Sequence, residues 1–442
     1  MSQSLRVAVV GAGPSGFYAA QALTRQLDSV HVDLFERLPA PYGLVRYGVA
    51  PDHPKLKIVT AVFDKIAGYD QVRFIGNVEL GRDLSLDELR QHYHAVIIAT
   101  GTAIGNKPGI AGDSLPGSVS AAEFVGWFNG HPDHQHHRFD FSGEHAAVIG
   151  NGNVALDVAR ILLRSVEELR TTDITKNALD CLQDSQITDV HIIGRRGPVQ
   201  VSFGKKELRE FEELNGVQCI VDPADLTLNT ELQATLDTAP DRRANYDTLS
   251  RFANPAKNQG AARRCHFHFY QSTVELLGND HVETLVRKSN LDGRADPAPI
   301  SCRLAVFGIG YRGESISQLE VNAKTGVIDN DSGRVLINGK TLAGVYVSGW
   351  IKRGPTGLIG TNRADSVATV ETLISDMANL PNPQTNQDIL QVLAEREHQT
   401  VDFDGWNRIN RVEQEGGAQR DAPAEKITNI NTMLALAAGD GG

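Results

Sequence analysis

The hydrophobic positions at the start of the chain form two short runs that predict neighbouring strands. The first run is residues 5–10 (LRVAVV), and the second is residues 32–36 (VDLFE). Near-continuous apolar runs of this length are typical of parallel strands that are buried on both faces. Between them, a glycine-rich turn at 11–16 leads into an apolar stretch that predicts a helix. The order strand, turn, helix, strand predicts a βαβ unit.

The same pattern recurs near residue 150. An apolar run at 146–149 (AAVI) is followed by a glycine-rich turn and a predicted helix at 156–160, and a further run lies at 190–193 (VHII). The chain therefore predicts an α/β fold with two Rossmann-like dinucleotide-binding domains. Other apolar runs that contain or end in glycine, and that predict further strands, lie at 95–101, 304–310 and 344–350.

The glycines of the first turn have the spacing of a dinucleotide-binding loop. Gly11 permits the tight turn, Gly13 lets the backbone approach a pyrophosphate, and Gly16 allows the helix to pack closely on the strand. Pro14 and Ser15 complete the loop. The N-terminus of the helix that follows favours the negative charge of a pyrophosphate. The loop therefore predicts a dinucleotide site.

The second glycine-rich turn, at 150–155, is the variant Gly-x-Gly-x-x-Ala. It also joins an apolar strand to a helix, so Asn151, Gly152, Asn153 and Val154 are predicted to contact the pyrophosphate of a second nucleotide. Two ordinary strand-to-helix turns are the weaker alternative for the two loops.

The two predicted sites differ at the position that meets the ribose. Glu36 ends the second strand of the first unit, where its carboxylate can accept hydrogen bonds from an unphosphorylated adenosine ribose. The strand at 190–193 is instead followed by Arg195 and Arg196. Guanidinium groups bind phosphate oxygens in pairs and would hold a ribose 2′-phosphate. The second site is therefore predicted to bind NADP.

One domain is predicted to be inserted into the other. Residues 1–103 form the first part of the domain for the first nucleotide, residues 104–311 form the NADP domain, and residues 312–442 return to the first domain and end in a C-terminal tail. A helix is predicted from about residue 361 to residue 373, and two nearby prolines mark a break after it. The chain beyond is expected to pack on the surface, with the last residues frayed.

Composition and charge exclude several classes of protein. The net charge of −11 over 442 residues argues against a general nucleic-acid binder. No apolar run approaches the length of a membrane span. The first predicted strand begins within a few residues of the N-terminus and no basic-then-apolar leader precedes it, so we expect a cytoplasmic enzyme.

The cysteines and histidines predict no metal site. Four cysteines are present with no short spacing between any two, which argues against a redox Cys-x-x-Cys pair, an iron–sulfur cluster and a structural zinc. The histidine-rich segment 131–137 is interpreted as a solvated loop, because no second cluster of ligands accompanies it. The cysteines are Cys181, Cys219, Cys265 and Cys302.

Five stretches together resemble the adrenodoxin-reductase-type NADPH–ferredoxin reductases. The resemblance implies FAD in the first domain, NADPH in the second, and ferredoxin as the electron acceptor. It also implies that a hydride passes from NADPH to FAD and that single electrons then pass to the iron–sulfur protein. The stretches are 10–18 (VGAGPSGFY), 41–54 (PYGLVRYGVAPDHP), 150–160 (GNGNVALDVAR), 194–210, and 348–357 (SGWIKRGPTG).

The resemblance implies further residues of the two cofactor sites. Glu207 belongs to the NADP site, and Gly357 is expected to lie on the nicotinamide side as well as near the flavin. The helix after residue 357 would direct its N-terminus at the flavin and stabilise negative charge there. The remaining residues expected around FAD are Leu44, Val78, Trp350, Leu358 and Ile359.

Two residues are candidates for proton handling. His53 lies in a proline-rich loop beside the expected flavin segment, and Asp157 lies one turn into the helix of the NADP loop. Hydride transfer itself needs no general acid, and Asp157 could instead complement the helix dipole. A catalytic role and a structural role remain open for each.

An acidic ferredoxin needs a basic surface on a reductase that is itself acidic. Charge steering of this kind weakens as salt is added. Five cations are expected to contribute, with dispersed solvated charges as the alternative: Arg242, Arg243, Arg251, Lys352 and Arg353.

Two other classes of function compete with ferredoxin reduction. One is a different flavoenzyme chemistry, such as disulfide reduction or substrate hydroxylation, and the lack of cysteine pairs counts against the former. The other is an NADP-sensing protein or scaffold without catalysis. A flavin absorbance that NADPH bleaches would separate the enzymes from the sensor.

Overall fold

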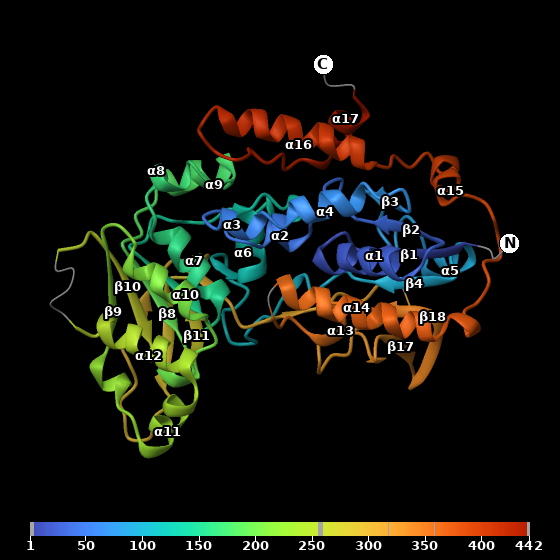
Figure 1. The fold of residues 1–442 in the computed structure, drawn as a ribbon. Helices are drawn as coiled ribbons and strands as arrows, with labels where there is room; N and C mark the ends of the chain where they lie inside the picture. The colour runs from blue at the N-terminus through green and yellow to red at the C-terminus, as the bar shows by residue number, and fades with distance from the viewer. Residues whose placement is uncertain (1–3, 255–259, 317, 358, 440–442) are drawn as a thin grey trace. The chain divides into compact units, whose positions relative to one another are not determined.

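The structure is a computed structural model of the chain and describes residues 4–254, 260–316, 318–357 and 359–439. The chain forms two compact units (Figure 1). Unit 2 lies within the sequence of unit 1, as the two-domain arrangement requires. Unit 1 comprises Met1–Ile104, Asn129–Pro132 and Tyr311–Gly442, and unit 2 comprises Gly105–Phe128 and Asp133–Gly310.

Unit 1 is built on a seven-stranded sheet in the order β16-β17-β18-β4-β1-β2-β3. Its five strands from β18 to β3 are parallel, and β17 and β16 add an antiparallel edge. The strands are β1 (Leu5–Val10), β2 (Val30–Phe35), β3 (Val72–Ile75), β4 (Ala95–Ile98), β16 (Asn330–Asp331), β17 (Arg334–Ile337) and β18 (Lys340–Val347).

Side chains from the parallel strands of unit 1 are buried on both faces of the sheet. Val7 and Val9 of β1 pack in one core with α1, α4, α14, α16 and α17, while Ala8 and Val10 pack in another core with α5 and α15. This explains why the strands read as continuous apolar runs. The helices are α1 (Pro14–Gln26), α2 (Leu44–Tyr47), α3 (Pro54–Lys57), α4 (Thr60–Ala67), α5 (Leu86–His92), α13 (Trp350–Arg353), α14 (Ile359–Ser375), α15 (Ile389–Glu395), α16 (Phe403–Ala418) and α17 (Ile430–Ala438).

Unit 2 is built on a six-stranded parallel sheet in the order β6-β14-β7-β8-β10-β9. A three-stranded antiparallel sheet, β11-β12-β13, covers one of its faces, and helices cover the other. The parallel strands are β6 (Ser118–Ser120), β7 (His145–Ile149), β8 (Asp189–Ile193), β9 (Val217–Val221), β10 (Arg263–His268) and β14 (Leu304–Phe307), and the small sheet contains β11 (Gln271–Leu277), β12 (Thr284–Ser289) and β13 (Ile300–Ser301).

The helices of unit 2 supply its larger core. That core contains aromatic side chains of α6 and the apolar face of α7, packed on the parallel sheet. The short strands β5 (Ile104–Gly105) and β15 (Tyr311–Arg312) pair where the chain passes between the units. The helices are α6 (Ala121–Phe128), α7 (Asn153–Leu163), α8 (Val166–Leu169), α9 (Lys176–Gln183), α10 (Lys205–Arg209), α11 (Thr230–Thr238) and α12 (Pro240–Phe252).

Three details of the sequence-based elements are wrong. The strand predicted over 344–350 ends at Val347, because Gly349 adopts a φ of 78° and caps helix α13, which begins at Trp350. The helix predicted from about residue 361 begins at Ile359. The C-terminal part is more than a surface covering, since Trp406 is 1% exposed and belongs to the core of unit 1.

A row of histidines crosses the parallel sheet of unit 2. Nδ1 of His145 lies 3.1 Å from Nε2 of His191, and Nδ1 of His191 lies 3.0 Å from Nε2 of His268. His266 stacks on His191 at 4.5 Å between ring centroids and contacts Asp189 at 2.7 Å. Burial, reinforced by the neighbouring imidazoles and Arg287, lowers the pKa of His191 to about 2 and of His268 to about 3. Both rings are therefore neutral at neutral pH.

We expect unit 2 to lose stability as the pH falls below about 6.5, the pKa of an unfolded histidine. Because His191 and His268 resist protonation when folded, the unfolded state binds more protons at acidic pH. Their contribution is complete above that pH, and the free energy of unfolding then falls by about 1.4 kcal/mol per pH unit for each ring until its folded pKa is reached. Urea unfolding at pH 7 and pH 5 measures this slope.

The double variant His191→Leu/His268→Leu removes the two rings of the row whose pKa values are lowered to about 2 and about 3. It should reduce the difference in unfolding free energy between pH 7 and pH 5 by roughly 2–4 kcal/mol. His136→Gln, at an exposed position, serves as the control and should leave the difference unchanged. An unaltered pH dependence in the double variant would contradict this reading of the row.

None of the helices in the described ranges combines the length and the apolar character that a bilayer crossing requires.

Candidate functional site

The first glycine loop contains two glycines that the protein's own packing requires. Gly11 has a φ of 108°, and a Cβ atom there would lie 2.6 Å from the carbonyl oxygen of Ala99. A Cβ atom at Gly16 would lie 1.9 Å from the carbonyl oxygen of Gly11. Gly16 therefore lets α1 approach the end of β1, as its position in the motif predicts.

Gly13 is different, because the protein itself leaves room beside it. The nearest atom to a Cβ at Gly13 would be Cα of Gly43, at 3.8 Å, which is an ordinary contact. Gly13 caps α1, no side chain caps the helix, and the first turn carries no acidic residue. The free N–H groups of this turn suit a pyrophosphate, and the absence of a side chain at Gly13 lets one approach.

Glu36 lies one residue beyond β2, beside the first glycine loop. Its carboxylate accepts hydrogen bonds from the N–H groups of Ala12 at 2.9 Å and Leu38 at 3.2 Å. Burial raises the pKa of the Glu36 carboxyl, although these two bonds oppose the shift. The acid predicted for the ribose is thus held in place beside the loop.

The segment after the second strand packs against the same loop. The N–H of Tyr42 donates to the carbonyl oxygen of Ala12 at 2.8 Å. Leu44 follows and is 41% exposed. Val78 is buried at 2% exposure, and its backbone N–H donates to the carbonyl oxygen of Glu36 at 2.9 Å. Leu44 is therefore exposed next to the segment that contacts the loop, whereas Val78 supports Glu36 from the core.

A late segment of the chain completes the first site at the N-terminus of α1. The hydroxyls of Ser15, Ser348 and Ser366 meet at 3.0–3.2 Å and are buried. A Cβ at Gly349 would lie 2.3 Å from Oγ of Ser15, so the turn before α13 lies directly on the first helix. The indole N–H of Trp350 is buried with no hydrogen-bond partner among the described residues. An orphaned donor beside the loop fits a bound ligand with acceptor atoms.

The chain after helix α13 becomes exposed at Thr356 and Gly357. Gly357 is exposed with a φ of 81°, and Ile359 begins α14 and packs partly on the core. Leu358 lies outside the described residues. Helix α14 packs on α1, the helix of the first glycine loop.

The second glycine loop repeats the geometry of the first in unit 2. A Cβ at Gly150 would lie 2.3 Å from the carbonyl oxygen of Gly308, whereas a Cβ at Gly152 would meet nothing within 4 Å. Gly152 caps α7, which also lacks a side-chain cap and an acidic first turn. Val154, in that first turn, is half-buried. The loop has the same vacant space above a helix N-terminus.

The two asparagines of this loop fix its surroundings. Oδ1 of Asn153 accepts the N–H of Gly204 at 2.7 Å, and the carbonyl oxygen of Asn151 accepts the N–H of Ser202 at 2.8 Å. Nδ2 of Asn151 is buried and unpartnered within the described ranges. It is a second orphaned donor, here beside the vacant space of unit 2.

The residue that follows the second strand of each glycine loop differs between the units. The N–H of Gly11 donates to the carbonyl oxygen of Phe35 at 2.8 Å, and the N–H of Gly150 donates to the carbonyl oxygen of Ile193 at 2.9 Å. Phe35 and Ile193 are therefore equivalent, and Gly194, which follows Ile193, occupies the place of Glu36. Arg195 and Arg196 come next. Both are exposed, and within the described part of the chain neither guanidinium pairs with a carboxylate.

The other predicted site residues have local partners. Glu207 lies on α10, with Oε2 2.2 Å from where a Cβ on Gly204 would stand. Asp157 binds the buried Arg160 at 2.7 Å. His53 is half-buried just before α3, and its backbone N–H donates to the carbonyl oxygen of Ala50 at 3.0 Å.

Two contacts lie beyond the reach of sequence reasoning. Tyr270 has a φ of 54°, and its hydroxyl would lie 2.0 Å from a Cβ on Gly197, so it packs over the arginine turn. Cys219 and Cys265 stand opposite each other on neighbouring strands. Burial raises the pKa of both thiols, which suppresses the reactive thiolate. Only strand register, which is not visible in residue spacing, could have indicated this pair.

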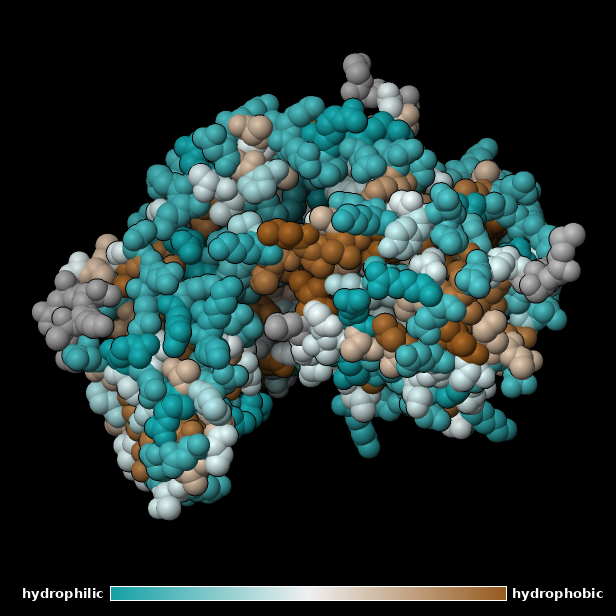
Figure 2. Space-filling model, viewed as in Figure 1, coloured by the Kyte–Doolittle hydropathy of each residue, from teal (hydrophilic) through white to brown (hydrophobic). Residues whose placement is uncertain are grey.

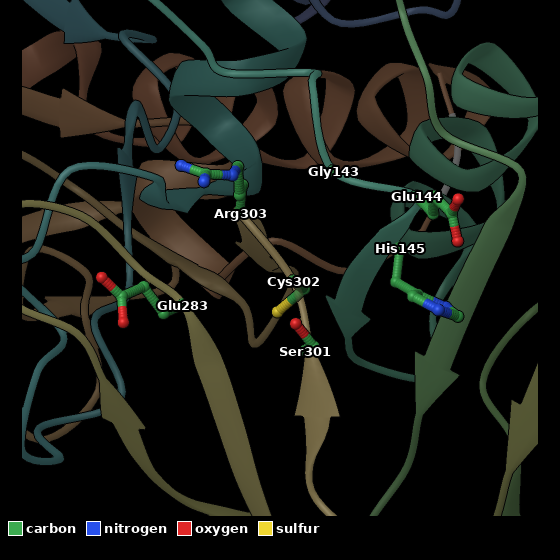
Figure 3. Close-up of a pocket in the computed structure, with 7 residues that line it drawn as sticks. All are labelled: Gly143, Glu144, His145, Glu283, Ser301, Cys302 and Arg303. Atoms are coloured by element: carbon green, nitrogen blue, oxygen red, sulfur yellow. The ribbon is translucent and has the colours of Figure 1, made fainter.

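A separate cavity of about 530 Å³ lies at the amino end of β7, the opposite end of that strand from Gly150 (Figure 3). No residue predicted for either nucleotide lines it. Within the described ranges, no group of three or more His, Cys, Asp or Glu side chains is arranged to hold a metal ion. The residues lining the cavity are Gly143, Glu144, His145, Glu283, Ser301, Cys302 and Arg303.

Comparison with known proteins places the chain in a family. Residues 5–222 match the model described as pyridine nucleotide-disulphide oxidoreductase. NADPH:adrenodoxin oxidoreductase, mitochondrial, from Arabidopsis thaliana is 38% identical over 99% of this chain and 96% of the relative. NADPH-ferredoxin reductase FprA from Mycobacterium tuberculosis is 39% identical over 98% of this chain and 99% of the relative.

A solved structure agrees with these matches. The structure described as Mycobacterium tuberculosis FprA in complex with NADPH has a TM-score of 0.92 and 38% sequence identity, and it covers 99% of this chain and 100% of that one. The similarity extends over both units and is not limited to the glycine loops. The chain therefore belongs to the adrenodoxin-reductase-type NADPH–ferredoxin reductases, flavoproteins related to the pyridine nucleotide-disulphide oxidoreductases.

Proposed function

We propose that this chain is an FAD-dependent NADPH–ferredoxin reductase, with FAD in unit 1 and NADPH in unit 2. The observation that carries the proposal is the contrast between the two loops. Each has a middle glycine, Gly13 or Gly152, beside vacant space at an uncapped helix N-terminus. The acid Glu36 stands at one ribose position, and Arg195 and Arg196 follow the other.

The residues of unit 1 bind and orient the flavin nucleotide in this proposal. The N-terminus of α1 receives the pyrophosphate, and Glu36 accepts hydrogen bonds from the ribose. Trp350 offers its unpartnered indole N–H, and the N-terminus of α14 stabilises negative charge near the ring. When bound, FAD supplies the hydride acceptor and the one-electron donor that no side chain of the chain provides.

The residues of unit 2 select and position NADPH. Arg195 and Arg196 hold the 2′-phosphate, and Asn151 to Val154 contact the pyrophosphate. Glu207 belongs to the same NADP site. Gly357, which belongs to unit 1, stays a candidate for the nicotinamide side. Hydride transfer then depends on orientation more than on proton transfer.

His53 and Asp157 stay candidates for proton handling. Asp157 already neutralises the fully buried guanidinium of Arg160, which is a sufficient structural reason for its presence. His53 lies half-buried just before α3 and stays a candidate on its position alone.

Disulfide reduction is the second candidate function, because the family model carries that name. The thiols argue against it. All four cysteines are free, and burial raises the pKa of Cys302 to about 12 as well as raising the pKa values of Cys219 and Cys265. A redox-active pair needs an accessible thiolate.

Absorbance measurements test the proposed function directly. The purified protein should contain one FAD per chain, NADPH should bleach it without oxygen, and a ferredoxin of the host should restore the oxidised spectrum. Protein that contains no flavin, or flavin that NADPH does not bleach, would contradict the proposal. A panel of ferredoxins then identifies the partner.

The basic docking surface for ferredoxin is narrower than the sequence implies. Arg243 pairs with Asp237 at 2.6 Å and Arg251 pairs with Glu212 at 2.7 Å. Lys352 and Arg353 of unit 1 both face Asp365. Paired cations attract an acidic partner less, so we place the steering charge of unit 2 on three exposed cations that pair with no carboxylate among the described residues and that lie outside the predicted 2′-phosphate site. These are Arg242, on α12, and Lys206 and Arg209, on the adjoining α10.

Unit 1 offers an apolar surface to the same acidic partner. Figure 2 shows hydrophobic residues gathered over α2 to α4. Leu56, Ile58 and Val62 are 45%, 67% and 40% exposed, and the exposed Lys55 lies beside them. The surface follows directly on the segment that contacts the first glycine loop. We propose that it forms the apolar part of the ferredoxin contact.

Charge reversal should separate docking from chemistry. Arg242→Glu combined with Lys206→Glu should raise the apparent KM for ferredoxin about tenfold at low salt, and the difference should shrink as salt is added. Ile58→Asp should raise KM at all salt concentrations. NADPH-driven reduction of ferricyanide needs no docking and should be unchanged.

The control for net charge is Lys176→Glu, an exposed position on α9 of the same unit. It should leave KM near the wild-type value. If ferricyanide and ferredoxin rates fall together in the test variants, these residues serve the fold or NADPH binding instead of docking.

A further inference from the structure

The segment that touches the first glycine loop has a strained backbone. Tyr42 has a φ of 84°, a conformation rarely adopted by residues with a side chain, and Gly43 follows with a φ of 49°. This turn presses on the loop, since a Cβ at Gly43 would lie 3.1 Å from Cα of Gly13. Strain of this kind persists only where surrounding contacts hold it, and it concentrates at ligand sites.

The contacts that hold the segment come from helix α16, which is more than 350 residues away in the sequence. Glu413 accepts two hydrogen bonds from Arg46, at 2.8 Å from Nη1 and 2.6 Å from Nη2. The indole N–H of Trp406 donates to the hydroxyl of Tyr42 at 3.0 Å. Figure 1 shows α16, in red, running beside α2 and α4, in blue.

These contacts are buried and mutually reinforcing. The side chains of Arg46 and Glu413 are 7% and 0% exposed, and the guanidinium lies 5.1 Å from the ring of Trp406. Trp406 and Glu413 are seven residues apart, so they lie on one face of the helix. Burial opposes the charge of Arg46, yet the carboxylate of Glu413 raises the pKa of Arg46, so the guanidinium stays ionised.

Further hydrogen bonds hold Tyr42 and Glu413 in place. The hydroxyl of Tyr42 also donates to Asp64 of α4. On the other side, the carboxylate of Glu413 accepts the N–H of Ile427 at 2.8 Å. The chain after α16 is thereby hydrogen-bonded to the same ion pair. Together these contacts connect α4, through Tyr42 and α16, to the C-terminal segment.

We propose that α16 is a positioning element of the FAD site, in which Glu413 and Trp406 hold Arg46 and Tyr42. They fix the backbone at 42–43 as the wall that faces Gly13, where the cofactor's pyrophosphate approaches. This inference rests on the proposed binding of FAD in unit 1. Neither Glu413 nor Trp406 belongs to a glycine loop, so both act through other residues.

The ion pair between Arg46 and Glu413 can fix the backbone geometry without adding much to the stability of the fold. A buried ion pair adds little net stability compared with apolar side chains of similar volume, because both charges lose their hydration. What it adds is a fixed geometry, since two parallel hydrogen bonds define one arrangement. Replacing the pair by apolar residues should therefore preserve the fold and loosen the wall.

The test is the double variant Arg46→Met/Glu413→Leu, compared with wild type after removal of FAD. Titration of each apoprotein with FAD, followed by quenching of flavin fluorescence, should show at least tenfold weaker binding in the variant. Urea unfolding should remain cooperative in the variant apoprotein, although the variant also loses the hydrogen bond from Ile427 to Glu413. An FAD affinity within twofold of wild type would overturn the proposal.

The matched control is Arg334→Met/Asp376→Leu. This pair is also bidentate and in unit 1, at 2.7 and 2.9 Å, but its described contacts include no residue of the glycine loop or of 41–48. It should leave FAD affinity unchanged. An equal loss of FAD affinity in the control would overturn the positioning role, because disturbance of any ion pair in the unit would then suffice.

Trp406→Phe gives a second test, which removes the indole N–H together with one of its two fused rings and keeps an aromatic ring in the core. It should weaken FAD binding two- to fivefold, and it decides the matter if the double variant does not fold. A wild-type chain that binds no FAD would contradict the proposed function. A wild type that binds FAD, with both α16 variants unaffected, would overturn only the role of α16.

Discussion

Gly13→Val is expected to give a folded protein that retains less than a tenth of the wild-type FAD. Gly13 has a φ of −84° and a ψ of −174°, which valine adopts readily, and a Cβ there meets only Cα of Gly43 at 3.8 Å. The added methyl groups would therefore occupy the space of the cofactor instead of colliding with the backbone. The ratio of flavin absorbance to protein absorbance measures the loss, and circular dichroism measures the fold.

Gly16→Ala provides the contrast within the same loop. Its Cβ would lie 1.9 Å from the carbonyl oxygen of Gly11, so even one methyl group should disrupt the packing of α1 on β1. We expect little folded protein from this variant. Full FAD content in Gly13→Val, or loss of its fold, would contradict the role given to Gly13.

Neutralising Arg195 and Arg196 together is expected to weaken NADPH binding by 100- to 1,000-fold. Hydrogen bonds from a charged donor to phosphate contribute about 1.5–3 kcal/mol each, and here two donors stand beside each other without a competing carboxylate in the described ranges. NADH has no 2′-phosphate, so its affinity should change less than about threefold. Anaerobic bleaching of the flavin, titrated with each nucleotide, measures both affinities.

Arg242→Gln is the control for this prediction, because it removes an exposed charge from the same unit. It should leave NADPH affinity unchanged. An equal loss for NADPH and NADH in the double variant would show that the arginines support the turn rather than select the phosphate.

The elements that hold the nucleotide loops could be predicted from sequence because their signals are local. The run at 5–10 coincides with β1, and the glycine spacing identifies α1 and α7. Burial of a parallel strand on both faces leaves a continuous apolar run that reads directly from the chain. The strand predicted through Trp350 failed at Gly349, because a positive φ ends β18 inside an apolar run.

The support of the first site could not be predicted, since its contacts join distant segments. Glu413 lies on a largely polar helix, and nothing in its surroundings indicates that it is fully buried against Arg46. The strained φ of Tyr42 is equally invisible, because sequence patterns favour glycine or asparagine at such positions. Long-range ion pairs and backbone strain leave no periodic pattern in the sequence from which they could be predicted.

The interleaving of the two units constrains the order of folding during synthesis. β1 to β4 leave the ribosome first, but β18, which pairs with β4, and α14, which packs on α1, are still to be made. Unit 2 is complete in sequence at Gly310 and can fold while the sheet of unit 1 is unfinished. Helix α16 emerges almost last. A nascent chain therefore contains the whole sequence of unit 2 before that of unit 1, and premature termination after Gly310 and before Lys340 would leave unit 2 entire and unit 1 without β18, α14 and α16.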